Sequence, residues 1–115
     1  MRATIAGVLL LLAVPVPVSA TAGWYLLSPI IALDGDSVEK STSAKAVTDP
    51  PLSQWHHEGA FDSARECNAQ RERNWQKDFA LWREKDKASR PWLVEAFFMR
   101  SQAAVCIASD DPRLK

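Results

Sequence analysis

One long amphipathic helix constrains the fold of this chain more than any other feature of its sequence. Side chains that share one helical face recur at steps of three and four residues: Ala64, Cys67, Asn68, Arg71, Trp75, Phe79 and Trp82. This spacing predicts a helix from about Ser63 to about Lys87, with one face buried against a sheet. Arg71 interrupts that face, so we expect it to lie at the margin or to pair with an acid.

Two residues could cap the start of this helix. Ser63 and Glu66 fit the S-x-x-E capping box, in which the serine oxygen accepts a hydrogen bond from an amide near the helix start. Asp62 is the alternative cap one residue earlier, and its negative charge suits the positive end of the helix dipole. The residues therefore predict the helix start and leave two candidate caps.

The N-terminus has the organisation of a secretory signal peptide. Arg2 gives a basic start, an apolar leucine-rich segment follows, and small residues provide cleavage sites after Ala20 and Ala22. We therefore assign residues 1–22 to a signal peptide. An uncleaved membrane anchor is the alternative, because the chain stays uncharged from the basic start as far as Asp34.

Export would place the two cysteines, Cys67 and Cys106, in an oxidising environment, where one disulfide is their simplest use. Closing the loop between them would stabilise the fold by about 4 kcal/mol, because the unfolded chain loses entropy. A catalytic thiol or a metal thiolate is disfavoured, since neither cysteine belongs to a C-x-x-C motif.

The exported domain, residues 23–115, has an α+β pattern. Branched, aromatic and alternating residues predict strands at 23–29, 52–61 and 103–108. With two helices, the order is strand, strand, long helix, short helix, strand. We expect a small antiparallel sheet of about three strands, covered on one face by the long helix.

Two segments connect these elements. Residues 34–51 are polar, contain turn-forming residues and end in two prolines, so we expect a flexible loop there. Pro91 suits the first turn of the second helix, which should reach about Met99 and could be capped by Ser89.

The aromatic side chains divide into an expected core and an expected surface. Trp24 and Trp92 lie near the starts of their elements and are candidates for a partner surface. The helical stripe and the apolar face of the second strand predict core positions for Trp55, Phe61, Trp75, Phe79 and Trp82.

The charge pattern argues against a nucleic-acid binder. The chain has 14 basic and 14 acidic residues, and removal of residues 1–22 takes away only Arg2, which leaves a net charge of minus one. A phosphate-binding stripe would be far more basic.

Motifs for catalysis or cofactor binding are also lacking in the sequence, including a nucleophile elbow and a glycine-rich phosphate loop. His56 and His57 would point to opposite faces of a strand and could not easily share a metal ion. We expect His57 to be a partly buried ring bonded to the backbone. Asp34 and Asp36 resemble the start of a calcium-binding loop, but the later ligand residues of such a loop do not follow them in the sequence. A triad of histidine, Glu58 and a serine needs residue types that any such domain contains by chance. We expect no enzyme, no cofactor and no metal.

Several motifs together resemble a family of short, exported, uncharacterised bacterial proteins. They are Gly23-Trp24-Tyr25-Leu26-Leu27-Ser28-Pro29, Pro51-Leu52-Ser53 with Trp55, Phe61-Asp62-Ser63-Ala64 with Cys67, and Cys106-Ile107-Ala108-Ser109-Asp110-Asp111-Pro112-Arg113-Leu114. The resemblance covers most of the exported domain except the loop before Pro50 and residues 91–99, and Ile30 replaces a second proline. It implies export and a bacterial envelope location, supports the cysteine pair, and implies no activity or catalytic residue.

We therefore expect a non-catalytic binding or structural module of the bacterial envelope, periplasmic or secreted. Its partner would be a protein or another envelope component. If the N-terminal segment is retained, the chain would instead be a membrane-anchored assembly factor, and only then would it contact the membrane. An enzyme inhibitor that uses residues 34–51 as a binding loop is the other alternative.

Overall fold

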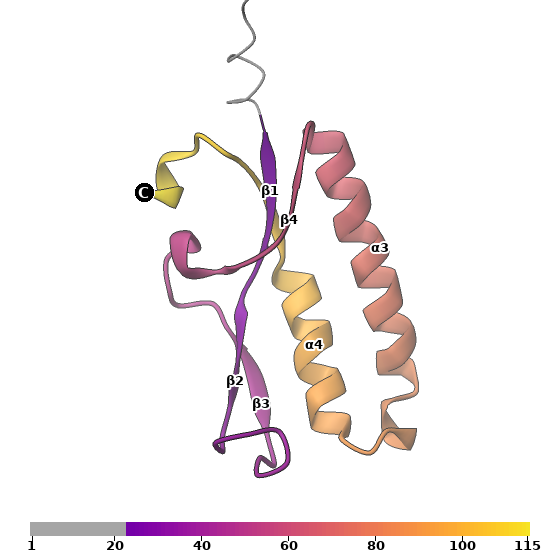
Figure 1. Cartoon of the computed structure of the whole chain (residues 1–115). Coiled ribbons are helices and arrows are strands. Elements are labelled where there is room, and N and C mark those ends of the chain that lie inside the picture. The colour runs from indigo at the N-terminus through magenta and orange to yellow at the C-terminus, as the bar shows by residue number, and fades with distance from the viewer. Residues whose placement is uncertain (1–22) are drawn as a thin grey trace, which may run out of the picture.

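The computed structural model describes residues 23–115, and the predicted signal segment at residues 1–22 lies outside them. The described chain is α+β, as predicted, with a small antiparallel sheet packed against two helices (Figure 1). Within this part of the chain, no helix is long and apolar enough to span a membrane.

The main sheet has three strands. Its central strand, β1 (Trp24–Ser28), pairs antiparallel with β4 (His56–Phe61) on one edge and with β5 (Val105–Ala108) on the other. All three predicted strands therefore form. β4 starts later than predicted, because a short 3-10 turn, η2 (Leu52–Gln54), precedes it.

Both faces of β1 are covered. Leu26 is fully buried in a cluster with Cys67 and Ala104 on the helix side, and Leu27, its neighbour on the opposite face, is fully buried as well. On the side away from the helices, η2 contacts a second 3-10 turn, η4 (Pro112–Leu114) (Figure 1). The prediction of a single covered face is therefore wrong, because Leu27 is as fully buried as Leu26.

The long helix, α3 (Ala64–Arg83), begins directly after its N-cap, Ser63, whose side-chain oxygen accepts a hydrogen bond of 3.1 Å from the Glu66 amide. This contact selects Ser63 over Asp62, which is exposed. The helix ends before the predicted boundary, and the chain continues as the 3-10 turn η3 (Lys85–Lys87).

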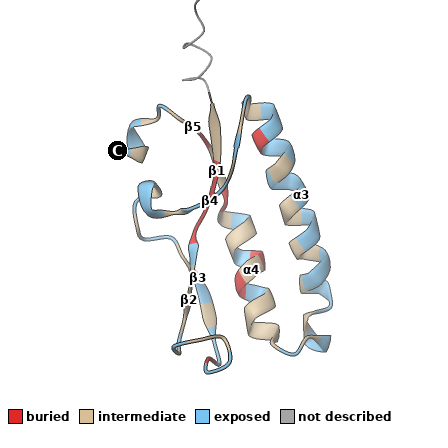
Figure 2. Ribbon diagram, viewed as in Figure 1, coloured by how far each residue is buried: buried red, intermediate tan, exposed pale blue. Residues whose placement is uncertain are grey.

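The second helix, α4 (Pro91–Ala103), starts at the predicted proline and is longer than predicted. Its N-cap is Arg90, which makes no side-chain capping bond, so the assignment of the cap to Ser89 is wrong. The helix continues beyond Met99 because its last turns pack against α3, a contact that local sequence does not report. Figure 2 shows buried residues where β1 meets the two helices.

A separate two-stranded hairpin follows the main sheet. β2 (Ile30–Leu33) and β3 (Ala44–Val47) pair antiparallel, and buried Pro29 separates them from β1. The hairpin contacts α4 and lies along it (Figure 1). The prediction of one loop over residues 34–51 therefore missed β3, a short segment of Ala, Lys and Val that finds its partner only in β2.

A hydrogen-bonded turn joins β2 to β3. The Asp34 carboxylate accepts bonds of 2.8 Å from both the hydroxyl and the amide of Thr42, and one of 3.2 Å from the Ser43 amide. The buried Ser41 hydroxyl accepts a bond of 3.0 Å from the Gly35 amide. The Thr42 side chain, followed by the two amides, lowers the pKa of Asp34 from 3.8 to about 2.

Asp34 should make stability depend on pH in the acid range. Because its pKa is lower in the folded state, its contribution is complete above the unfolded value of 3.8 and is lost as the pH falls through about 2. We expect the urea midpoint of the unchanged protein to fall between about pH 5 and about pH 2, and to fall less in Asp34→Asn. Asp36→Asn, at an exposed neighbouring carboxylate, is the control. Equal pH profiles for Asp34→Asn and the unchanged protein would contradict the prediction.

The aromatic side chains of α3 form a cluster with Phe98 of α4. The rings of Trp75 and Phe79 stack with centroids 5.0 Å apart, and the Trp82 ring lies 5.1 Å from that of Phe98. Phe98 is buried, whereas the three α3 rings are half-buried. The helix contacts the sheet, as predicted, through Cys67 at its start, whereas the rings from Trp75 onward pack against Phe98 of α4, which the sequence did not predict.

Candidate functional site

A polar cleft lies between α3 and α4, beside the end of β1. It has a narrow part of about 110 Å³ and a wide part of about 560 Å³, which share Arg71, Ser101 and Ala104. The wide part is completed by Glu72, Trp75 and Gln102. The narrow part is completed by Ser28, Glu58, Asn74, Lys77, Asp78 and Arg100.

A β-bulge places Glu58 at the narrow part. The register of β1 against β4 shifts between Leu26 and Leu27, which leaves Glu58 as an extra residue on β4. Its carboxylate accepts a hydrogen bond of 2.7 Å from the Ser28 hydroxyl, which belongs to a residue only 2% exposed. The bulge therefore supplies the acceptor that this buried hydroxyl requires.

Glu58→Ala should lower the free energy of unfolding by about 1–3 kcal/mol, because it leaves the Ser28 hydroxyl buried without its acceptor. The double variant Ser28→Ala/Glu58→Ala removes both partners and should lose less stability than Glu58→Ala alone. Urea unfolding of the two variants measures the difference. If the double variant is as unstable as Glu58→Ala, the loss of stability does not come from an unpaired Ser28 hydroxyl.

The helices contribute the other charged groups. Asp78 of α3 accepts a hydrogen bond from the Ser101 hydroxyl of α4. Three cationic side chains face the same space: Arg71 and Lys77 from α3, and Arg100 from α4. The guanidinium carbon of Arg100 lies 4.9 Å from the centre of the Phe97 ring, a cation–π contact that restricts its movement.

The three cations of the cleft have no ion-pair partner in the described chain. Both ion pairs found within residues 23–115 lie elsewhere, at Glu84–Lys87 and Asp111–Arg113. Of the two positions predicted for Arg71, it occupies the exposed margin. The cleft therefore presents cationic groups that remain available to a ligand.

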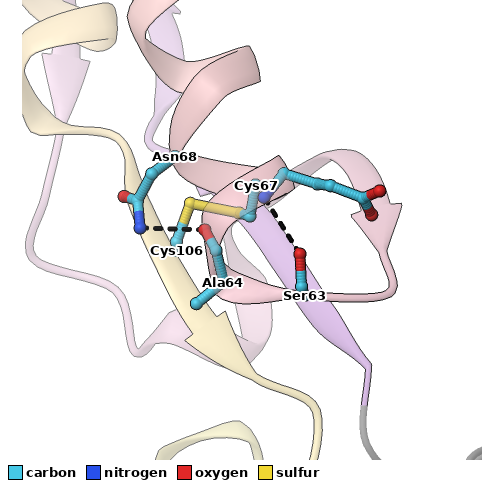
Figure 3. The surroundings of a disulfide bond; sticks show 6 residues. Ser63, Ala64, Cys67, Asn68 and Cys106 are labelled. Carbon is cyan, nitrogen blue, oxygen red and sulfur yellow. Dashed lines mark hydrogen bonds between the residues drawn. A yellow bond between two sulfur atoms is a disulfide. The ribbon is translucent and has the colours of Figure 1, made fainter.

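The predicted Cys67–Cys106 disulfide is present and supports the cleft. It joins α3 to β5 with the two Cα atoms 6.0 Å apart. Figure 3 shows Cys67 in the first turn of α3, where its amide donates to the Ser63 carbonyl at 3.1 Å. Arg71 follows Cys67 by one helical turn, and Ala104 precedes Cys106 by two residues. The cross-link therefore joins the two segments that carry these cleft residues.

The aromatic residues predicted as core are all half-buried. The indole N–H of Trp55 donates to the Pro50 carbonyl at 2.9 Å, and Phe61 packs against the Leu26 cluster. The residues with this intermediate exposure are Trp55, Phe61, Trp75, Phe79 and Trp82.

The two tryptophans predicted for a partner surface have different positions. Trp24 is half-buried and packs against the buried cluster around Leu26, and its assignment to a partner surface stays a prediction. Trp92 is half-buried in the first turn of α4. The tryptophan at the cleft is Trp75, which was predicted for the core.

Neither His56 nor His57 lines the cleft. His56 and His57 are exposed, and the His57 ring lies 5.0 Å from that of Tyr25, so the prediction of a partly buried His57 is wrong. Glu58 instead binds Ser28. Within residues 23–115, no group of three or more His, Cys, Asp or Glu side chains could hold a metal ion.

Sequence reasoning singled out Arg71, Trp75 and Glu58 among the cleft residues, and it considered Glu58 only as a chance member of a triad. The other side chains come from β1, α3 and α4 and share no motif. One signal could have pointed to the site: Ser28 is a polar residue at the end of an otherwise apolar strand.

No protein-family model, no curated protein and no solved structure matches this chain. The resemblance to short exported bacterial proteins therefore stays a prediction.

Proposed function

We propose that this chain is a small, non-catalytic binding module of the bacterial envelope that acts through the cleft between α3 and α4. The cleft itself carries the proposal. Its wide part is an open depression of about 560 Å³ that shares Arg71, Ser101 and Ala104 with the charged narrow part.

The frame around the cleft favours a preformed site. The disulfide ties α3 to β5, Ser101 joins the two helices through Asp78, and Ser28 joins β1 to Glu58 on β4. Such restraints reduce the entropy that binding would otherwise cost.

The hydrogen bonds of the cleft favour binding over catalysis. Ser28 and Ser101 each donate directly to a carboxylate, whereas a serine nucleophile usually donates to a histidine base. His56 lies opposite Ser28 in the strand pair, but the Ser28 hydroxyl donates to Glu58, and His57 packs against Tyr25.

Site-specific photo-cross-linking in the native host tests the binding role. A photoreactive amino acid at Gln102, which is exposed and lines the cleft, should give an adduct that depends on ultraviolet light. The same amino acid at Glu39, which is exposed in the β2–β3 turn, is the matched control. Equal labelling at the two positions, or none at either, would count against a binding module.

The compartment is the second part of the proposal. The Cys67–Cys106 disulfide is compatible with an oxidising, exported environment. We propose that residues 1–22 direct the chain to the periplasm or the medium. The intact mass of the native protein, taken with alkylation before and after reduction, should show cleavage after Ala20 or Ala22 and a disulfide. An uncleaved mass would favour the membrane-anchored assembly factor, and free thiols would contradict an oxidised domain.

A further inference from the structure

The narrow part of the cleft has an excess of positive charge. Arg71, Lys77 and Arg100 face two carboxylates, those of Glu58 and Asp78. Each carboxylate already accepts a serine hydrogen bond, whereas the cations take part in no ion pair within residues 23–115. A ligand whose single negative charge lies in the narrow part would balance that part. Glu72 adds a third carboxylate in the wide part, so the excess of positive charge is confined to the narrow part.

The geometry of the cations suits an oxyanion. Arg71 and Arg100 approach from different helices, and a guanidinium can donate two parallel hydrogen bonds to a carboxylate or a phosphate. Stacking on Phe97 restricts Arg100 before any ligand arrives. The volume of about 110 Å³ accommodates one such group and little else.

The wide part offers room for the remainder of a ligand. Gln102 can donate and accept hydrogen bonds, and the half-buried Trp75 provides an apolar surface. Glu72 faces the same space, and its carboxylate accepts a bond of 2.7 Å from the Gln76 side chain. The remainder of the ligand is therefore expected to be polar and uncharged or cationic near Glu72.

We propose that the cleft binds a small ligand through a compact oxyanion, a carboxylate or a phosphate, held by Arg71, Lys77 and Arg100. The inference rests on the proposed binding function and adds the chemistry of the group that is recognised. Asp78 limits the affinity for such a group because its own negative charge lies in the same space.

Three probes test the assignment in the disulfide-bonded domain at constant ionic strength: N-acetyl-trialanine with a free carboxylate, its C-terminal amide, and inorganic phosphate. The Trp75 indole N–H resonance reports binding, because this residue lines the cleft. The carboxylate peptide or phosphate should bind saturably, and the amide should bind at least tenfold more weakly than the free carboxylate. Binding of the peptide alone identifies a carboxylate ligand, and binding of phosphate alone identifies a phosphate ligand.

Three variants with matched changes separate specific binding from general charge. Arg71→Gln should weaken oxyanion binding about tenfold. Asp78→Asn keeps an acceptor for Ser101 and should tighten binding severalfold, because it removes a repulsive charge. Arg73→Gln changes an exposed arginine of the same helix that bonds Gln70, and it should have no effect. Equal weakening by Arg71→Gln and Arg73→Gln, or a failure of both oxyanion probes to bind, would overturn the assignment. If Gln102 gives a cleft-specific adduct but neither oxyanion probe binds, the proposed binding function would stand and the assignment of an oxyanion ligand would be wrong.

Discussion

Replacing Cys67 and Cys106 together with alanine should lower the free energy of unfolding by about 4 kcal/mol. The cysteines are 39 residues apart in sequence, and the loop between them contains all of α4 and most of α3. Without the bond, the unfolded chain regains the entropy of this loop. A domain of this size typically has only about 5–15 kcal/mol of stability, so urea unfolding should show a large fall in the midpoint.

The unchanged protein in a reducing buffer is the matched control for this variant. It retains both sulfur atoms and loses only the bond, so its stability should fall by a similar amount. A loss below about 1 kcal/mol in both cases would contradict the prediction, because it would mean that packing alone already closes the loop. A large loss in the alanine variant alone would assign the effect to side-chain packing around fully buried Cys67.

Leu26→Ala should destabilise the protein by about 3 kcal/mol. Leu26 is fully buried in the central strand, where it contacts the cluster of Cys67 and Ala104. The disulfide and the neighbouring strands limit how far this cluster can close around the missing atoms, so a cavity should remain. Urea unfolding measures the loss.

Leu81→Ala makes the same chemical change at a position that is 57% exposed on α3. It should alter the free energy of unfolding by less than about 0.5 kcal/mol. Similar losses in the two variants would show that the stability of the protein does not depend on the cluster beneath β1.

Much of the fold could be predicted from residues that act locally. The α3 stripe has helical spacing, Ser63 and Glu66 form a start signal, and the motif around β1 favours an extended chain. Two cysteines allow only one intramolecular disulfide, and the sequence predicted that pair. The hairpin of β2 and β3 was missed because β3 has no strong strand propensity of its own and depends on its partner.

The cleft could not be predicted in the same way. Glu58 reaches Ser28 because a bulge shifts the register of two strands that are distant in sequence. Asp78 meets Ser101 only when the two helices pack together. In the sequence, each of these residues looks like an ordinary residue of a solvent-exposed helix face or of a strand end.

The sequence by itself therefore determined the α+β class, the start of the long helix and the cysteine pair. These features depend on periodicity, capping and composition, which act over a few residues or leave few alternatives. Only the tertiary structure decided that both faces of β1 are covered, that residues 44–47 form a strand, and that Arg71, Lys77 and Arg100 face one space. These features depend on contacts between elements that are far apart in the chain. Such contacts form only when the elements pack together, so no single segment of the sequence predicts them.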